Sequence, residues 1–319
     1  MVRRMLFGAF GLLAILSLSA AMFIATNWAP ELSLAELKTR WAPPPSTFLN
    51  AAGLSVHLRD EGPRTDPAPI VLLHGMGSSL HAWEGWAQAL KAEHRVVRFD
   101  LPGFGLTGPS PDGIYTTERD VSTVIAVLDK LGIERCVLGG VSLGGTVAWR
   151  TALAHPSRVE KLILVDSSGY PIEPLSQPIG YRLPGLPGAG TSWLAENTLP
   201  RFLVVQGMRN VFGDPAKVTD EMVDRTVELT RLKGNRRAIV ERFRQDDDGD
   251  FYLRIPDLKL PTLIIWGTKD RLVPPENAYR FHREIADSKL VMFDGLGHAP
   301  EEEDPARSVQ AVKEFLKLN

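Results

Sequence analysis

The chain has 319 residues, 44% of them hydrophobic, which is enough to bury the core of one catalytic domain that carries an insertion. Its formal net charge of −2, without a Lys/Arg stripe along any predicted helix, disfavours nucleic-acid binding. The single cysteine, Cys136, excludes an intramolecular disulfide, and no metal-site spacing occurs, so we expect neither a metal nor another cofactor.

The first predicted element is an apolar helix at the amino terminus. Residues 6–26 would span about 30 Å as a helix, the thickness of a bilayer core. Arg3 and Arg4 precede this run, which favours a single-pass anchor with the body on the non-cytoplasmic side. A signal peptide cleaved near the small residues 19–21 is the alternative, but the apolar run continues at 22–25, which favours the uncleaved anchor.

Three segments are expected along the chain. Residues 1–27 form the membrane anchor or signal sequence, 28–45 a proline-rich linker, and 46–319 the catalytic domain. The linker ends in APPP at 42–45, and consecutive prolines stiffen a chain and deny it helix or sheet. We therefore interpret the linker as a spacer.

The domain is predicted to begin with a hairpin and to continue as strands that alternate with helices. Strands are expected at 48–50, 54–59, 69–73, 95–99, 135–138, 161–165, 262–266 and 289–293, and helices at 82–92, 117–131, 144–154, 276–285 and 306–316. Such alternation indicates a mostly parallel sheet that is covered by helices on both faces.

The alternation stops after Asp166, where the chain becomes rich in proline and glycine. Two helical stretches follow, at 218–232 and 236–244, before the alternation resumes. We therefore expect a helical cap inserted at about 168–258.

The motif GVSLG at 140–144 joins a predicted strand to a predicted helix. A nucleophile in a sharp strand-to-helix turn needs glycine two positions before and after it, because side chains there would collide with the neighbouring strand and helix. The start of the helix also directs N–H groups and a partial positive charge toward a developing oxyanion. Ser142 is therefore the candidate nucleophile.

A serine hydroxyl needs a base within hydrogen-bond reach and an acid that orients the base. His298, in a glycine-containing loop after the last predicted strand, is the candidate base. Asp270, directly after the preceding strand, is the candidate acid. Asp166 is an alternative acid because it also follows a strand.

Five motifs carry a resemblance to a known family. They are HGMG at 74–77, DLPGFG at 100–105, the serine turn, WGTKD at 266–270 and GH at 297–298. Together they resemble the α/β-hydrolase superfamily, in its esterase- or lipase-like form with a helical cap, whose triad follows the same chain order. The resemblance implies an oxyanion hole formed by the backbone N–H groups of Met76 and Leu143.

The resemblance extends from about residue 48 to the carboxyl terminus and narrows the chemistry. Relatives that open epoxides or remove halides have aspartate as the nucleophile, so Ser142 favours acyl transfer instead. The carbon–carbon bond hydrolases of ring-fission products also use serine in an SxGG helix start, which 142–145 match. Many of them have Trp after the catalytic histidine, where this chain has Ala299.

The cap is expected to select the substrate. Its apolar residues could line a hydrophobic cleft or pack the cap onto the body, and two tryptophans after the oxyanion loop face the same choice. These residues are Trp83, Trp86, Trp193, Leu194, Phe202, Leu203, Val204 and Phe212.

We therefore predict an α/β-hydrolase fold with a mostly parallel twisted sheet and a helical cap, preceded by a transmembrane helix. The predicted function is hydrolysis of a small-molecule or lipid carboxylic ester through an acyl-enzyme on Ser142, with membrane contact through the amino-terminal helix. Two alternatives remain: carbon–carbon bond hydrolysis, and a ligand-binding or interaction protein on a hydrolase scaffold without turnover. The sequence predicts neither the acyl chain length nor the oligomeric state.

Overall fold

An eight-stranded sheet forms the centre of the computed structural model, which describes residues 2–171, 193–194, 196–245 and 249–317. The strand order is β1-β2-β4-β3-β5-β6-β7-β8. The strands are β1 Thr47–Ala51, β2 Leu54–Glu61, β3 Ile70–Leu73, β4 Val96–Phe99, β5 Cys136–Val141, β6 Val159–Val165, β7 Thr262–Gly267 and β8 Ser288–Phe293. β2 pairs antiparallel with β1 and β4, and all other neighbours are parallel. The predicted mostly parallel sheet is confirmed.

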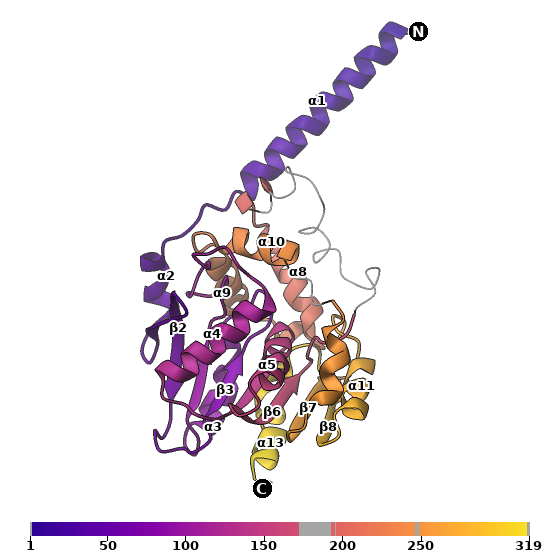
Figure 1. Cartoon of the computed structure of the whole chain (residues 1–319). Helices are drawn as coiled ribbons and strands as arrows, with labels where there is room; N and C mark the ends of the chain where they lie inside the picture. The colour runs from indigo at the N-terminus through magenta and orange to yellow at the C-terminus, as the bar shows by residue number, and fades with distance from the viewer. Residues whose placement is uncertain (1, 172–192, 195, 246–248, 318–319) are drawn as a thin grey trace.

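Helices cover both faces of the sheet (Figure 1). The body helices are α3 Glu84–Leu90, α4 Thr117–Lys130, α5 Leu143–Ala154, α11 Glu276–Glu284 and α13 Pro305–Leu316. The helices α4, α5 and α11 pack on one face, and α3 and α13 on the other. Every residue of β3, β5 and β7 is buried, which is the pattern of parallel strands covered on two sides.

Local signals explain where these helices begin and end. The Thr116 side chain accepts a hydrogen bond from the Arg119 N–H and caps the start of α4. Gly132, with φ 64°, lies just past its end, in the left-handed conformation that commonly terminates helices. The predicted body helices are confirmed, except that the one expected at 82–92 begins earlier, as the 3-10 turn η1 Leu80–Trp83.

A long amino-terminal helix, α1 Val2–Thr26, extends away from the body (Figure 1). The predicted helix is thus confirmed. None of the helices, judged on the residues that the structure describes, combines the length and apolarity needed to cross a membrane.

The expected spacer at 28–45 contains a helix, which corrects the prediction. Helix α2, Leu34–Trp41, begins with a capping box in which Ser33 and Glu36 exchange side-chain-to-backbone hydrogen bonds. The prolines at 43–45 follow the helix and only prevent its continuation. Trp41 donates to a Glu228 carboxylate oxygen at 2.6 Å, so this segment is fastened to the cap.

The described part of the cap contains α8 Arg201–Val211, η2 Pro215–Lys217, α9 Asp220–Thr230, α10 Asn235–Gln245 and η3 Phe251–Asp257. Helices α9 and α10 match the two predicted helices. Helix α8 was not predicted, because none of its residues is buried and Gly207 lowers its helix propensity. The part of the expected cap at 172–192 lies outside the described residues.

Candidate active site

Ser142 occupies a strained turn between β5 and α5. Its backbone has φ 54° and ψ −119°, a conformation that is rare for a residue with a side chain. The Ser142 N–H donates to the Val165 carbonyl oxygen at 3.1 Å, and the Ser142 carbonyl accepts from Thr146 and Ser168. The surrounding β6 and α5 therefore hold the strained turn in place.

The glycines beside Ser142 are required by close backbone approaches. A Cβ on Gly140 would lie 2.1 Å from the Gly144 carbonyl oxygen, and one on Gly144 would lie 2.2 Å from the Leu73 carbonyl oxygen. Both distances are far shorter than any van der Waals contact, so only glycine fits. The steric reason predicted for the GVSLG spacing is present in the structure.

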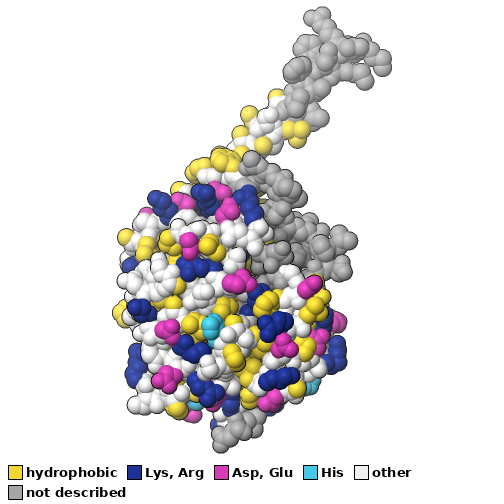
Figure 2. Space-filling view, in the orientation of Figure 1, with side chains coloured by type: hydrophobic (Ala, Val, Ile, Leu, Met, Phe, Trp, Pro, Cys, Tyr) yellow, Lys and Arg dark blue, Asp and Glu magenta, His cyan; other side chains and the backbone are white. Residues whose placement is uncertain are grey.

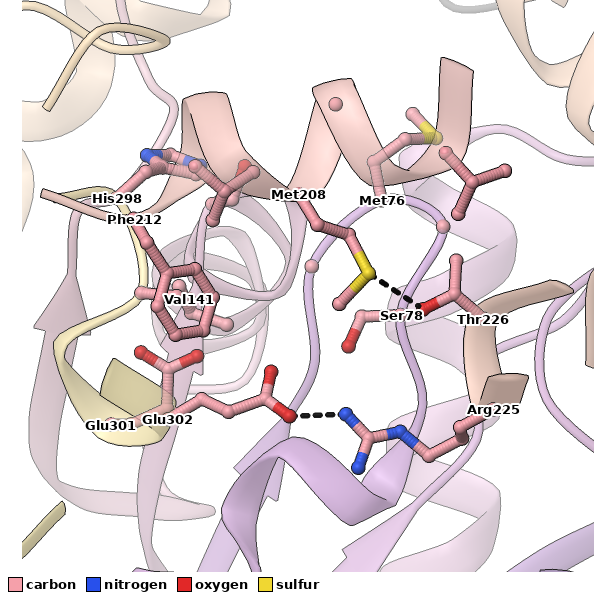
Figure 3. Close-up of a pocket in the computed structure, with 17 residues that line it drawn as sticks. Met76, Ser78, Val141, Met208, Phe212, Arg225, Thr226, His298, Glu301 and Glu302 are labelled. Carbon is pink, nitrogen blue, oxygen red and sulfur yellow. Dashed lines mark hydrogen bonds and ion pairs between the residues drawn. The ribbon is translucent and has the colours of Figure 1, made fainter. Parts of the chain in front are cut away.

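His298 and Asp270 are joined by a buried hydrogen bond. The distance from His298 Nδ1 to Asp270 Oδ2 is 2.7 Å. Asp270 Oδ1 accepts two further bonds, from the N–H groups of Leu272 at 2.7 Å and Val273 at 3.0 Å. This acid therefore orients the imidazole, and His298 and Ser142 line the same cavity, into which Figure 3 looks.

Asp166, the alternative acid, lies beside Asp270 and does not replace it. Its Oδ1 accepts from the Gly267 N–H at 3.0 Å, whereas its Oδ2 is buried and has no donor among the described residues. Burial and the negative charge of Asp270 raise the pKa of Asp166 well above its ordinary value. A neutral Asp166 can donate a hydrogen bond to Asp270. The alternative acid of the sequence analysis can therefore support Asp270 in orienting His298.

These three side chains also bring possible metal ligands together. One nitrogen or oxygen atom from each of Asp166, Asp270 and His298 lies within 4.8 Å of the others. His298 and Asp270 are already bonded to one another, and the raised pKa of Asp166 favours its neutral, weakly coordinating form. The chemistry of these three side chains therefore fits a hydrogen-bonded network that shares protons better than a metal site.

The loop after β3 carries Met76, one of the two residues expected to form the oxyanion hole. Among the described residues none accepts a hydrogen bond from the Met76 N–H, and a Cβ on Gly75 would lie 3.2 Å from the Ser142 Cβ. The ring of His74 fixes the loop, because Nδ1 bonds the Gly75 carbonyl at 2.8 Å and Nε2 accepts from the Leu101 N–H at 3.0 Å. Burial lowers the pKa of His74, which keeps the ring in this neutral form.

Leu143 is the other residue expected to form the oxyanion hole. It is the first residue of α5, and the N–H groups of a first helical turn have no partner within the helix. The adjacent helix start adds a partial positive charge. Met76 lines the same cavity as Ser142, and Leu143 directly follows Ser142 at the start of α5.

A cavity of about 270 Å³ lies between the body and the cap. Its apolar lining comes from both parts and comprises Met76, Val141, Val204, Met208, Val211, Phe212 and Ala299. Of the cap residues considered in the sequence, Val204 and Phe212 line this cavity. Four others, Trp193, Leu194, Phe202 and Leu203, are exposed instead, and Trp83 and Trp86 are buried in the core.

Charged residues close one side of the cavity. Arg225 of α9 forms an ion pair with Glu302, and Glu301 lies beside them (Figure 3). Glu301 is 2% exposed, and burial raises its pKa well above the ordinary value, which favours the neutral carboxyl group. Glu301 and Glu302 belong to the acidic run at 301–303 that follows His298. Neither these two residues nor Arg225 was recognised from the sequence.

Glu303 is a further residue that sequence reasoning missed. Its carboxylate accepts hydrogen bonds from the N–H groups of Gly213 and Asp214 in the cap, at 2.9 and 2.8 Å, and of Gly297 at 2.8 Å. The His298 N–H donates to the Val211 carbonyl at 2.7 Å. These hydrogen bonds therefore connect the cap to the loop that carries His298, next to the imidazole.

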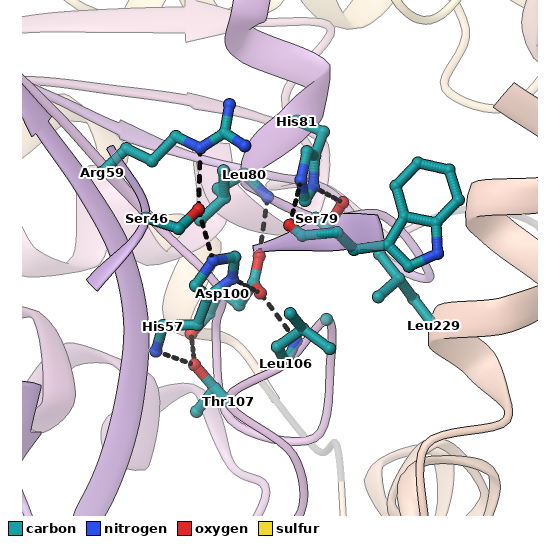
Figure 4. A network of polar contacts seen from close by, with 12 residues as sticks. Ser46, His57, Arg59, Ser79, Leu80, His81, Asp100, Leu106, Thr107 and Leu229 are labelled. Carbon is teal, nitrogen blue, oxygen red and sulfur yellow. Dashed lines mark hydrogen bonds and ion pairs between the residues drawn. The ribbon is translucent and has the colours of Figure 1, made fainter. Parts of the chain in front are cut away.

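A second Ser-His-Asp arrangement is present but lies away from the cavity (Figure 4). His57 Nδ1 bonds Asp100 Oδ2 at 2.7 Å, and His57 Nε2 lies 3.0 Å from Ser46 Oγ. The Ser46 hydroxyl also accepts from Arg59 Nε at 2.9 Å, and Asp100 accepts from the Leu80 N–H at 2.7 Å. His57 is fully buried, so this network fastens the start of the domain to the loops beside the sheet.

Comparisons with known proteins support the same fold. A family model described as alpha/beta hydrolase fold matches residues 68–305. A 2-hydroxy-6-oxo-2,4-heptadienoate hydrolase from Pseudomonas putida is 30% identical over 280 residues, which cover 83% of this chain and 94% of the relative.

Two solved structures have the same fold. A thermophilic esterase from Thermogutta terrifontis has a TM-score of 0.70 and 25% identity over 85% of this chain and 98% of its own. A membrane phospholipase A described as a bacterial virulence factor has a TM-score of 0.73 and 22% identity over 98% of both chains, a likeness of fold alone. The motifs, the topology and the family match together establish that this chain belongs to the α/β-hydrolase-fold family.

Proposed function

We propose that the chain is a serine hydrolase that cleaves carboxylic esters. The observation that carries the proposal is the His298–Asp270 hydrogen bond of 2.7 Å beside a cavity that also contains Ser142 and Met76. This arrangement provides a nucleophile, an oriented base and oxyanion donors around one space that a carbonyl group could occupy.

The reaction proceeds in two steps through an acyl-enzyme. His298 takes the proton from the Ser142 hydroxyl as its oxygen attacks the ester carbonyl, while Asp270 stabilises the imidazolium. The Met76 and Leu143 N–H groups bond the oxyanion. His298 then protonates the leaving alcohol, and in the second step it takes a proton from the water that attacks the acyl-enzyme, which restores Ser142.

Carbon–carbon bond hydrolysis is the second candidate, because the Pseudomonas putida relative is named for a heptadienoate substrate. Such a substrate carries a carboxylate. Among the described residues that line the cavity, Arg225 is the only Lys or Arg, and it is already paired with Glu302. Because its lining offers no unpaired cation among the described residues, the cavity is better suited to an uncharged ester.

A direct comparison of substrates tests this choice. The full chain would be assayed with p-nitrophenyl esters of graded acyl length and with 2-hydroxy-6-oxo-2,4-heptadienoate. We expect a higher kcat/KM for the best ester, and a loss of about 10⁴-fold or more in Ser142→Ala. Faster turnover of the dienoate would favour the second candidate. A chain that turns over neither and fails to react with a fluorophosphonate would be the non-catalytic alternative.

We also propose that α1 attaches the enzyme to a membrane, with the body on the non-cytoplasmic side. Arg3 and Arg4 before the apolar run and the exposure of Leu18 and Met22, 76% and 69%, support this location. Export after cleavage is the alternative. Full-length protein that resists extraction from membranes by alkaline carbonate is the expected result, and complete release would contradict it.

A further inference from the structure

Exposed apolar side chains are concentrated at one end of the molecule. Of the thirteen exposed large hydrophobic residues among those described, ten lie on α1 or at its junction with the cap. They are Ile15, Leu16, Leu18, Met22, Phe23, Trp28, Trp193, Leu194, Phe202 and Leu203. Figure 2 shows hydrophobic side chains along the described part of α1 and at its root. A concentration of this kind marks a surface that is covered by a partner or a lipid phase.

A cleft of about 500 Å³ lies at the root of α1, next to this apolar surface. Its walls come from three segments and comprise residues 28–31, residues 196–197, and residues 233, 234, 236 and 237. Backbone hydrogen bonds join the segments, from the Ala29 N–H to the Asn197 carbonyl at 3.1 Å and from the Lys233 N–H to the Leu32 carbonyl at 2.9 Å. The cleft is therefore part of the fold and not a gap between independent parts.

Arg236 is buried in the wall of this cleft, and no described residue forms an ion pair with it. It is 5% exposed, and its Nη1 has no hydrogen-bond partner among the described residues. Burying a guanidinium nitrogen without a hydrogen-bond acceptor is unfavourable, since the nitrogen loses its hydration and Glu31 and Glu196 act on it only at longer range. An anion bound in the cleft would satisfy it.

Two further cations make the cleft favourable for an anion. Lys233 and Arg237 are exposed on its wall, and neither forms an ion pair with a described residue. The acids in the wall are Glu31 and Glu196, and Glu31 already accepts a hydrogen bond from the Gly234 N–H at 2.8 Å. The cationic groups in the wall thus outnumber the acidic ones, and the buried Arg236 has no ion-pair partner among the described residues.

We propose that this cleft binds the phosphate group of a glycerophospholipid from the membrane that α1 contacts. The neighbouring apolar surface distinguishes a lipid from free phosphate, because Trp28 lines the cleft and packs against Trp193 with ring centroids 6.0 Å apart. Tryptophan pairs of this kind suit the boundary between headgroups and acyl chains. The proposal rests on the membrane attachment proposed above, and the bound lipid orients the cap relative to the bilayer.

The site is separate from the catalytic cavity. None of the residues lining the cleft also lines the cavity that contains Ser142 and His298. A lipid bound through its phosphate therefore has a docking role and is distinct from the ester that is hydrolysed. Binding and turnover can be measured independently.

The test is a lipid titration of the full chain in detergent micelles, in the Ser142→Ala background so that no lipid is hydrolysed. The probes are dioctanoyl phosphatidylglycerol, dioctanoylglycerol, which has the same acyl chains without phosphate, and inorganic phosphate. Binding is measured by native mass spectrometry. We expect saturable binding of the phospholipid only, weakened about tenfold by Arg236→Gln, since a hydrogen bond to a charged group is lost.

Arg254→Gln is the matched control, because it also removes one positive charge but at an exposed ion pair with Asp257, outside the cleft. It should leave phospholipid binding unchanged. Equal binding of phospholipid and dioctanoylglycerol, or unchanged binding by folded Arg236→Gln, would overturn the proposal. Equally tight binding of inorganic phosphate would make the cleft a free-phosphate site and overturn the lipid assignment.

Folding of the variant is checked separately. Arg236→Gln made with Ser142 intact should melt as a folded protein and retain ester turnover. If it does not fold, the double variant Lys233→Gln/Arg237→Gln, which alters only exposed side chains, replaces it with the same expected loss of binding. Because this readout uses binding alone, its failure would leave the proposed esterase activity untouched, and the reverse also holds.

Discussion

Replacing Asp166 tests how the two acids beside His298 share a proton. Asp166→Asn keeps both contacts of a neutral carboxyl group: the amide oxygen can accept from the Gly267 N–H, and the amide nitrogen can donate to Asp270. We therefore expect ester turnover at pH 7 to stay within about threefold of the parent enzyme. Asp166→Ala removes the proton that a neutral Asp166 can donate to the Asp270 carboxylate.

The expected loss of activity in Asp166→Ala follows from the hydrogen bond that a buried, neutral Asp166 can donate to Asp270. A hydrogen bond to a charged group contributes about 1.5–3 kcal/mol. If its loss raises the activation free energy by the same amount, because Asp270 then orients His298 less well, kcat falls about ten- to hundredfold. Asp270→Asn should lose more, because its amide cannot stabilise the imidazolium in the same way. The expected order of activity is parent, Asp166→Asn, Asp166→Ala, Asp270→Asn.

Asp166→Asn also has a predicted effect on the free energy of unfolding. Burial and Asp270 raise the pKa of Asp166 in the folded state above its ordinary value of 3.8, so the folded protein keeps a proton that the unfolded chain releases. The free energy of unfolding of the parent therefore falls as pH rises from about 4 toward the raised pKa. Asparagine has no such dependence, so the stability of Asp166→Asn relative to the parent should increase over this range.

The assays are steady-state ester hydrolysis and urea unfolding at pH 4 and pH 8. If Asp166→Asn were as inactive as Asp270→Asn, an ionised Asp166 would be needed and the reasoning would be wrong. A stability difference between variant and parent that did not change with pH would refute the neutral state of Asp166.

Three further predictions concern residues around the site and the cap. Glu303→Gln should lower kcat about tenfold with little change in KM, because the ties between cap and histidine loop weaken; unchanged single-turnover rates would exclude this role. Gly144→Ala should abolish folding or strongly lower the melting temperature, since its methyl group would meet the Leu73 carbonyl at 2.2 Å, and an unaltered circular-dichroism melt would contradict this. Ser33→Ala should lower the free energy of unfolding by about 1 kcal/mol in urea titrations through the lost cap on α2, while ester turnover is retained.

The fold and the strained strand-to-helix turn at Ser142 could be predicted because their causes are local. The GVSLG turn needs glycine at fixed positions, and apolar runs such as those of β3 and β7 are typical of buried parallel strands. Helix α2 had a local signal too, because Ser33 and Glu36 have the spacing of a capping box. The prolines that follow led to the interpretation of the whole segment as a spacer.

Other features depend on contacts that a single sequence does not reveal. Asp166 and Asp270 both follow strands, and only the path of the loop after β7 decides which carboxylate reaches His298. Glu303 contacts cap residues about ninety positions away in the chain. Helix α8 has no buried residues, so its sequence lacks the apolar periodicity that predicts a helix, although several of its residues line the cavity.

The central claim is that Ser142 forms an acyl-enzyme with an ester. The most direct measurement is mass spectrometry of the full chain after rapid mixing with a p-nitrophenyl ester and acid quenching, followed by peptide mapping. We predict an acyl group on the peptide that contains Ser142 in the parent enzyme and its absence in Ser142→Ala. Ester turnover without any acylated Ser142, or with the same rate in Ser142→Ala, would contradict the proposed mechanism.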